Sequence, residues 1–316
     1  MIDVVVVSRN NEAQGICSYE LASADDSALP PFSAGAHIDV HLPGGLIRQY
    51  SLCNHPDERH RYLIGVLRDP ASRGGSQSLH EQIKAGDRLR ISEPRNLFAL
   101  AHEARRSLLF AGGIGITPIL CMAERLTHSG ADFEMHYCAR SSERAAFVER
   151  IRNSPFADRV FLHFDEQPET ALDAARVLAN PQPDSHLYVC GPSGFMQYVL
   201  DSARTQGWQE PAMHREYFAG AAVDSSNDGS FSVKVSSTGQ VFDIPADKTV
   251  VQVLESHGID IPMSCEQGVC GTCLTRVLEG VPEHRDMFLT EEEQACNDQF
   301  TPCCSRSKSP MLVLDI

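Results

Sequence analysis

The 316-residue sequence predicts a multidomain α+β protein, because three parts of the chain carry three different patterns. Residues 1–102 hold short, alternating, β-branched segments separated by turn residues, which predicts a small antiparallel β-barrel. Residues 103–218 alternate apolar strands with amphipathic helices, which predicts a doubly wound parallel sheet. Residues 230–316 begin with a hairpin pattern and a helix and then carry a cluster of cysteines.

The stretch 219–229 is small, polar and without periodicity, so it is expected to link the second and third domains. Strands are expected at 3–8, 16–23, 37–42, 47–52, 61–67 and 87–92, with one helix at 76–83. In the α/β part, strands at 107–113, 133–141, 160–164 and 186–191 are expected to lead into helices at 117–130, 143–153, 171–179 and 192–207.

Composition and charge limit the classes of function. The formal net charge of −15 argues against binding to nucleic acid, whose phosphates need a positive face. The sequence shows no apolar run near the roughly 20 residues that span a bilayer and no secretory signal pattern, so the protein is expected to stay in the cytoplasm. Its eleven cysteines, an odd number, favour metal or redox chemistry over a disulfide framework.

The stretch "SCEQGVCGTC", 264–273, has the spacing C-x4-C-x2-C. A zinc site prefers two CxxC pairs, whereas a four-residue gap forms a wide loop whose amides can face bridging sulfides, as in plant-type [2Fe–2S] ligation. Zinc and free structural thiols remain as alternatives. Gly268 and Gly271 would let this loop pass close to a cluster. The candidate ligands are Cys265, Cys270, Cys273 and, after 29 intervening residues, Cys303.

Two segments of the first domain suit an anionic, planar ligand. In "RQYS", Arg48 and Tyr50 share one face of a strand, and a guanidinium binds phosphate while an aromatic face suits a flat ring. In "RGGSQSLH", 73–80, two glycines and a serine precede a helix whose first amides can hold a phosphate. Each motif alone also fits an ordinary strand or a flexible loop. The second motif contributes Gly74, Gly75 and Ser76.

Two strand-to-helix turns of the second domain suit a nucleotide. "AGGIGITP", 111–118, has a G-x-G start formed by Gly113 and Gly115, but Pro118 takes the place of the third glycine of a Rossmann fingerprint. Proline is acceptable in the first helical turn, where no amide hydrogen bond is lost. "YVCGPSGFM", 188–196, by itself fits a buried cysteine before a tight turn equally well.

The order of these motifs resembles the reductase components of Rieske oxygenases, the family of phthalate dioxygenase reductase and vanillate O-demethylase reductase. The resemblance covers essentially the whole chain. It implies a flavin-binding barrel, a ferredoxin-reductase-like nucleotide domain and a C-terminal plant-type ferredoxin with the β-grasp fold. It also implies FMN rather than FAD, and NADH rather than NADPH, although the positive residues near Arg140 could suit the 2′-phosphate of NADPH.

The resemblance assigns roles to individual residues. It places Arg48 at the flavin phosphate, Tyr50 on the isoalloxazine ring and Ser51 near N5. It favours Cys303 over its neighbour Cys304 as the fourth cluster ligand. It places Phe218 against the flavin, with Glu216 nearby, although Phe218 also fits a simple domain-closing aromatic. For the nucleotide it implicates the GGxGxTP turn and the cysteine turn, which supply Gly113, Gly115, Thr117, Cys190, Gly191 and Pro192.

The resemblance implies an electron-transfer enzyme that needs no hydrolytic site. NADH gives two electrons as hydride to flavin N5, and a one-electron cluster then passes them to a Rieske-type oxygenase. Residues 231–316 hold 13 acidic and 6 basic residues, so this part can attract a basic partner. The chain is expected to be a monomer. The alternatives are an electron-transfer subunit of a larger flavin dehydrogenase and a non-catalytic redox sensor.

Overall fold

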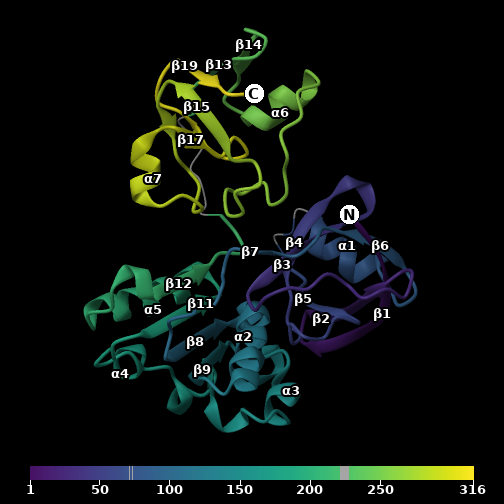
Figure 1. Ribbon diagram of the computed structural model, residues 1–316, viewed down its shortest axis with the longest axis vertical. Helices are drawn as coiled ribbons and strands as arrows, with labels where there is room; N and C mark the ends of the chain where they lie inside the picture. Colours follow the sequence, from purple (N-terminus) through teal and green to yellow (C-terminus); the bar gives the residue numbers. More distant parts are fainter. Residues whose placement is uncertain (71, 73, 221–227) are drawn as a thin grey trace. The chain divides into compact units, whose positions relative to one another are not determined.

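The computed structural model describes residues 1–70, 72, 74–220 and 228–316, which form two compact units, Met1–Glu216 and Tyr217–Ile316 (Figure 1). The first unit contains the segments predicted as barrel and α/β domains, and the second contains the cysteine cluster. Most of the expected linker, 219–229, lies outside the described residues. The division into three domains therefore stays a prediction.

An antiparallel sheet of order β4-β3-β6-β1-β2-β5 forms the barrel, and the additional strand β7 pairs with β3. A β-bridge between Leu52 and Ile64 connects the two ends of this order and closes the sheet. The elements are β1 (Ile2–Ala13), β2 (Ile16–Ser23), β3 (Ala36–His41), β4 (Ile47–Ser51), β5 (Tyr62–Leu67), α1 (Gly75–Gln82), β6 (Arg88–Ile91) and β7 (Arg95–Asn96).

Apolar side chains at alternate positions of the strands fill the barrel. In β6, Leu89 and Ile91 are buried while Arg88 and Arg90 are exposed, as a period of two requires. Val4 and Val6 of β1 join the same apolar core. The six strands and the helix therefore lie where the sequence predicted them.

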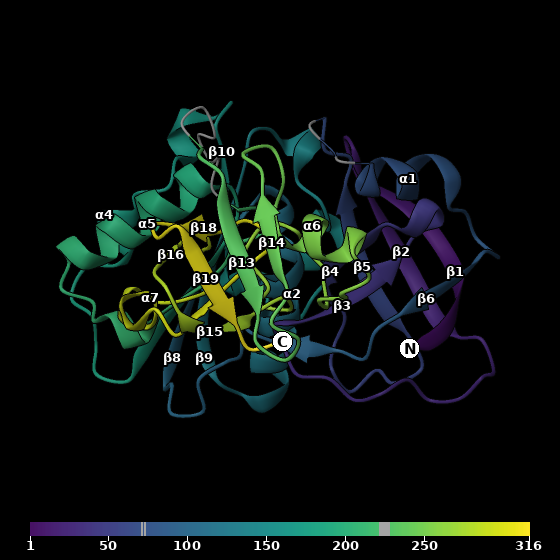
Figure 2. The same ribbon diagram turned by 90° about the horizontal axis from the view of Figure 1, so that it is seen from above.

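A parallel sheet of order β10-β9-β8-β11-β12 follows. The order reverses between β8 and β11, and right-handed crossovers then place α2 and α3 on one face and α4 and α5 on the other (Figures 1 and 2). The elements are β8 (Arg106–Gly112), α2 (Ile116–Ser129), β9 (Asp132–Ala139), α3 (Val148–Arg152), β10 (Val160–Phe164), α4 (Ala174–Val177), β11 (Ser185–Cys190), α5 (Ser193–Thr205) and β12 (Met213–Glu216).

Two helices are much shorter than predicted. The helix expected at 143–153 is a 3-10 turn at Ser142–Arg144 followed by α3, because Phe147 adopts a left-handed conformation with φ 61°. That conformation places the Phe147 ring in the core and lets the backbone N–H of Ala146 donate to the Tyr137 hydroxyl (2.9 Å). The helix expected at 171–179 is only α4. The predicted lengths of both helices were wrong.

The second unit has a mixed sheet of order β14-β13-β19-β15-β17 and a small sheet of β16 and β18. Helix α6 buries four apolar residues in the core of this unit, and a capping box of Thr249 and Gln252 begins it. The elements are β13 (Phe231–Val235), β14 (Val241–Ile244), α6 (Val250–Ser256), β15 (Thr275–Glu279), β16 (Pro282–Glu283), α7 (Glu291–Cys296), β17 (Gln299–Phe300), β18 (Arg306–Ser307) and β19 (Met311–Leu314).

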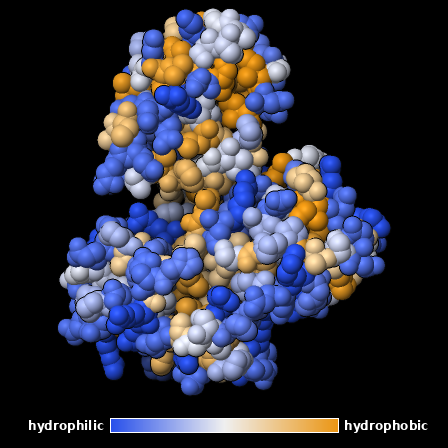
Figure 3. Space-filling view, in the orientation of Figure 1, coloured by the Kyte–Doolittle hydropathy of each residue, from blue (hydrophilic) through white to orange (hydrophobic). Residues whose placement is uncertain are grey.

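The surface is mostly polar. Hydrophilic residues predominate on the face of each unit shown in Figure 3, and apolar residues gather in smaller patches. Among the described residues, no helix combines the length and the apolar character that a membrane crossing requires.

Candidate functional site

Arg48 and the glycine turn before α1 meet in the structure. A Cβ on Gly75 would collide with the Arg48 side chain, so only glycine allows this approach. Gly74 begins the helix with φ 91°, and the Ser76 hydroxyl accepts a hydrogen bond from the backbone N–H of Asp69 (3.2 Å). A guanidinium and the first amides of an eight-residue helix thus lie together, which is a suitable arrangement for a phosphate.

Tyr50 lies on the same strand as Arg48, two residues further on. Its ring is half-buried and packs against the barrel core. Burial raises the pKa of the Tyr50 hydroxyl, and the nearby positive charge of Arg48 opposes this rise. Tyr50 is therefore a neutral aromatic group at physiological pH.

Ser51, at the end of β4, is buried and faces the carboxyl end of the parallel sheet. Its hydroxyl donates a hydrogen bond to Oε2 of Glu216 (3.2 Å), the last residue of β12. His37, the cross-strand partner of Ser51, has Nδ1 4.0 Å from Oε1 of the same carboxyl group. A hydroxyl, a carboxyl and an imidazole from three separate strands thus meet at one point.

Glu216 has an unusual proton affinity. Burial raises the pKa of Glu216 to about 8, and the hydrogen bond from Ser51 only partly opposes the rise. Cys190 is fully buried, and burial together with the charge of Glu216 raises the pKa of its thiol well above the ordinary value. At neutral pH the Glu216 carboxyl and the Cys190 thiol are therefore predominantly protonated.

The two predicted nucleotide turns are in direct backbone contact. A Cβ on Gly115 would collide with the carbonyl oxygen of Cys190 and lie 2.7 Å from the backbone nitrogen of Gly191. A Cβ on Gly191 would lie 2.9 Å from Cα of Gly112. The turns after β8 and β11 lie where the strand order reverses, which is where open α/β sheets bind ligands.

The other residues predicted to bind the nucleotide differ in burial and in their structural surroundings. Thr117 is buried, and its hydroxyl donates to the carbonyl oxygen of Ile114 (3.1 Å), which holds the turn before α2. Pro192 precedes α5 as its N-cap residue. Gly113 adopts φ 53° with open space where a Cβ would be. Arg140 is exposed beyond the end of β9.

Phe218 is the residue that the resemblance places against the flavin. It belongs to the second compact unit, and its side chain is 41% exposed. The structure brings Ser51 into contact with Glu216. A negative charge on Glu216 would raise the pKa of the Cys190 thiol further. The placement of Phe218 against the flavin stays a prediction.

The cysteine loop of the second unit brings the four proposed ligands together. The Cys303 thiol makes side-chain contacts with Cys265 and Cys273, and Cys265 also contacts Cys270. All four side chains are buried. Cys304 is only partly buried, contacts Cys303 and lies 3.3 Å from the Thr301 hydroxyl.

Backbone amides face these sulfurs. The N–H of Gln267 donates to Sγ of Cys265 (3.4 Å), and that of Thr272 donates to Sγ of Cys270 (3.5 Å). Contacts with the Cys270 and Cys303 thiols, together with the backbone amides, lower the pKa of the Cys265 thiol, which favours the thiolate that a metal binds.

Two glycines give the loop its shape. A Cβ on Gly268 would collide with Sγ of Cys304, and one on Gly271 would collide with the ring of Phe288. Both glycines have positive φ, 70° and 65°. Four converging thiols, amide donors and a tight backbone together fit a [2Fe–2S] cluster.

Sequence reasoning missed the roles of two residues. His37 is given no functional role by the sequence motifs, yet it is buried beside Glu216. Its pairing opposite Ser51 across β3 and β4 was the signal that could have located it. Phe288, which covers Gly271, carried no recognisable pattern.

Comparison with known proteins agrees with this geometry. Residues 233–308 match the family described as 2Fe-2S iron-sulfur cluster binding domain. The chain is 76% identical to a vanillate O-demethylase oxidoreductase of Pseudomonas putida, over 100% of both chains. It is 42% identical to a phthalate 4,5-dioxygenase oxygenase reductase subunit of Pseudomonas putida, over 98% of this chain and 95% of the relative.

A solved structure of phthalate dioxygenase reductase is also similar. It is described as a modular structure for electron transfer from pyridine nucleotides to [2Fe–2S]. The TM-score is 0.79 at 38% sequence identity, over 99% of this chain and 97% of that chain. The predicted family and fold class are therefore confirmed. The chain belongs to the oxygenase reductases that include phthalate dioxygenase reductase and vanillate O-demethylase oxidoreductase, enzymes that carry electrons from NADH through FMN to a 2Fe-2S cluster.

Proposed function

We propose that this chain is the reductase of a vanillate O-demethylase system and supplies electrons to its Rieske-type oxygenase component. The full-length identity of 76% to a vanillate O-demethylase oxidoreductase carries this proposal, since identity to the phthalate dioxygenase subunit is only 42%. The aromatic substrate would bind to the oxygenase, so no site for it is required here.

Three groups of the barrel are proposed to hold FMN. The phosphate lies between the Arg48 guanidinium and the first amides of α1, at Gly74, Gly75 and Ser76. The collision that any Cβ on Gly75 would have with Arg48 supports a site shaped for close backbone approach. Tyr50 packs on the ring system, and Ser51 contacts its polar edge.

The nicotinamide is proposed to bind at the carboxyl ends of β8 and β11. Cys190, Gly191 and Pro192 border its ring, and the turn of Gly113, Gly115 and Thr117 faces the pyrophosphate. Contact between the two turns supports a common site. Arg140 lies near the adenosine ribose, and NADH is the proposed donor.

When bound, FMN accepts a hydride from NADH and releases electrons one at a time to the cluster. The side chains around Ser51 prepare the site for this chemistry. The Ser51 hydroxyl keeps a defined direction through its hydrogen bond to Glu216, and the raised pKa of Glu216 keeps that carboxyl protonated near neutrality. A protonated carboxyl can donate a hydrogen bond without placing a negative charge beside incoming hydride.

In the second unit, Cys265, Cys270, Cys273 and Cys303 are proposed to hold the cluster. Their mutual contacts and the amides facing them support this set over one that contains Cys304. The proposed protein is a cytoplasmic monomer with three domains, 1–102, 103–218 and 230–316, joined by the linker 219–229.

Reconstitution with purified oxygenases tests which oxygenase is the electron acceptor of this chain. The chain, loaded with FMN, iron and inorganic sulfide, is combined with NADH and either a vanillate O-demethylase oxygenase or a phthalate 4,5-dioxygenase oxygenase. We expect substrate turnover per reductase to be at least about tenfold faster with vanillate and its oxygenase, because docking specificity amounts to a few kcal/mol at an interface.

Reduction of an artificial acceptor by NADH is measured in the same preparations. It controls for a damaged reductase, since it needs no oxygenase. Equal or faster turnover in the phthalate system, with intact reduction of the artificial acceptor, would contradict the vanillate assignment.

A further inference from the structure

Two histidines and an aspartate meet at the boundary of the barrel and the α/β sheet. His55 and Asp57 lie in the loop between β4 and β5, and His128 lies in the last turn of α2. Oδ2 of Asp57 is 3.8 Å from Nδ1 of His55 and 3.7 Å from Nε2 of His128. One ligand atom from each residue lies within 4.8 Å of both others.

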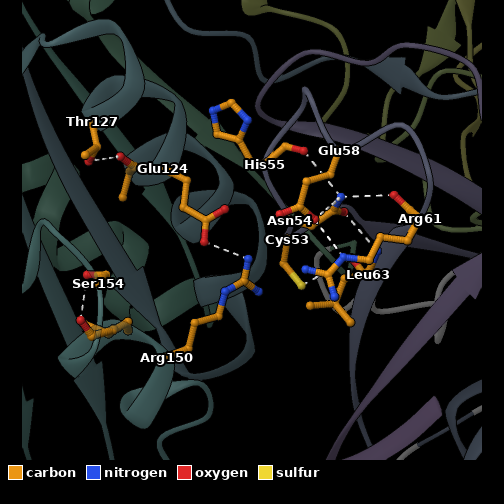
Figure 4. A network of polar contacts seen from close by, with 12 residues as sticks. Cys53, Asn54, His55, Glu58, Arg61, Leu63, Glu124, Thr127, Arg150 and Ser154 are labelled. Atoms are coloured by element: carbon orange, nitrogen blue, oxygen red, sulfur yellow. Dashed lines mark hydrogen bonds and ion pairs between the residues drawn. The ribbon is translucent and has the colours of Figure 1, made fainter.

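The loop that carries His55 and Asp57 is firmly held. The fully buried Asn54 accepts a hydrogen bond from the Leu63 backbone N–H (2.9 Å) and donates to the Arg61 carbonyl oxygen (3.1 Å). Figure 4 shows this network and the His55 ring on the side of the loop that faces α2. Binding of an ion would therefore order few additional groups.

Helix α2 is held to its neighbour α3 close to this loop (Figure 4). Oε1 of its Glu124 accepts a hydrogen bond from Nη2 of Arg150 (2.7 Å) beneath the loop (Figure 4). Gly130 ends the helix with φ 67°, directly after the turn that carries His128. His128 and Asp57 are each 62% exposed at the side chain, so an ion can reach them from solvent.

His55 has a ring nitrogen available for coordination. Nδ1 accepts a 3.2 Å hydrogen bond from the Asp57 backbone N–H, which an ion bound at Nδ1 would replace, and the buried Nε2 has no hydrogen-bond partner among the residues that the structure describes. Burial lowers the pKa of His55, and the positive charges of His128 and Arg125 lower it further. The negative charges of Asp57 and Glu58 oppose this effect. The ring is therefore the neutral form that binds metals.

We propose that His55, Asp57 and His128 form a binding site for a divalent transition-metal ion, with Zn²⁺ as the preferred ion. Two imidazole nitrogens and one carboxylate oxygen are a ligand set that zinc accepts, with water in the fourth position. Zinc–ligand bonds of about 2.0–2.1 Å in a tetrahedron place ligand atoms about 3.4 Å apart. The two distances to Asp57, 3.7 and 3.8 Å, need only a small contraction, and the two histidine nitrogens, within 4.8 Å of each other, must also move closer together.

The ion would connect the barrel to the α/β domain. Two ligands come from a barrel loop and one from α2, so zinc would resist separation of these parts. None of the three residues belongs to the proposed flavin, nucleotide or cluster ligands. The site would therefore act on the stability of the first unit and would not take part in electron transfer.

Isothermal titration of the holoenzyme with ZnCl2, in a buffer without chelators or thiols, tests the site. The wild-type protein is compared with His128→Gln and Asp57→Asn, and with His60→Gln as a matched control. His60 is an exposed histidine of the same loop and lies outside the triad. We expect one zinc ion per chain in the wild type and in His60→Gln, and at least about tenfold weaker binding in the other two variants.

Each variant must keep the flavin and cluster absorption of the wild type, which shows that it folds. Zinc should also raise the unfolding temperature of the wild type and leave that of His128→Gln unchanged. The proposal is overturned if wild-type protein binds no zinc, or if all variants bind it equally. Binding that persists in His128→Gln but disappears in Cys296→Ser would assign the ion to the exposed Cys296 thiol and equally overturn it.

Discussion

At the scale of single residues, the environment of Glu216 determines its protonation. The carboxyl group is buried at the end of β12 and has its pKa raised to about 8 from the ordinary 4.5. Between these two pH values the folded state binds one proton more than the unfolded state. The free energy of unfolding must therefore fall as pH rises from about 4.5 to 8.

Glu216→Gln should remove this pH dependence. At 1.36 kcal/mol per pKa unit, the wild-type contribution present below pH 4.5 and lost through pH 8 is at most about 5 kcal/mol. Urea unfolding at pH 5.5 and 8.5 should show a smaller difference in the variant, which lacks the ionisable group. Glu169→Gln, at an exposed carboxyl, is the control and should keep the wild-type slope. An unchanged slope in Glu216→Gln would contradict the raised pKa.

The proposed choice of Cys303 over Cys304 as the fourth ligand can also be tested at residue scale. Cys303 contacts two other proposed ligands, whereas Cys304 lies against Gly268 and the Thr301 hydroxyl. Cys303→Ser should lose most bound iron and the cluster absorption, because a neutral hydroxyl replaces a thiolate ligand. Cys304→Ser should keep both. Iron content per chain and the visible spectrum measure this, and the reverse pattern would identify Cys304 as the ligand.

At the scale of elements, the nucleotide site depends on contact between two strand-to-helix turns. Gly115 begins α2 against the carbonyl oxygen of Cys190, at the end of β11, with no space for a side chain. This contact holds the ends of neighbouring strands β8 and β11 at a constant separation. The geometry of the site therefore depends on a residue that need not touch the nucleotide.

Gly115→Ala should force the two turns apart. We expect a loss of about 1–3 kcal/mol in stability from overpacking and up to about 10²-fold slower flavin reduction by NADH. Stopped-flow absorbance and thermal unfolding measure these effects. Gly194→Ala is the matched control, since a Cβ there meets nothing within 4 Å in the first turn of α5. Equal behaviour of the two variants would show that the contact is unimportant.

At the scale of the whole molecule, the chain and its cysteine-bearing unit are both acidic. The net charge is −15, and residues 231–316 hold 13 acidic against 6 basic residues. Helix α7 begins with three glutamates, of which Glu293 caps the helix by accepting from the Thr290 backbone N–H (2.8 Å). Glu291 and Glu292 are exposed and have no capping role.

Electron transfer from the reductase to its oxygenase should slow as salt concentration rises. The double variant Glu291→Gln/Glu292→Gln should show a slower rate at low salt and a weaker salt dependence, because exposed charges act mainly on the association rate. NADH-driven reduction of a small neutral acceptor serves as the control and should change little. An identical salt dependence in variant and wild type would exclude α7 from the docking surface.

Local patterns were enough to locate many elements. The spacing of Cys265, Cys270 and Cys273 lies within ten residues, and alternation along the barrel strands predicted their positions, because both depend on neighbours in the chain. The broken helix at Phe147 could not be predicted this way, since burial of its ring in the core outweighs helical preference.

The sequence by itself therefore determined the family and the fold class, and it supplied the proposed set of cysteine ligands. Only the tertiary structure decided which distant residues meet. Ser51 and Glu216 are 165 residues apart and come together because a closed barrel and a parallel sheet place their strand ends side by side. His55 and His128 meet because the loop between β4 and β5 lies beside the last turn of α2. Contacts of this kind depend on topology, which no local period of the chain contains.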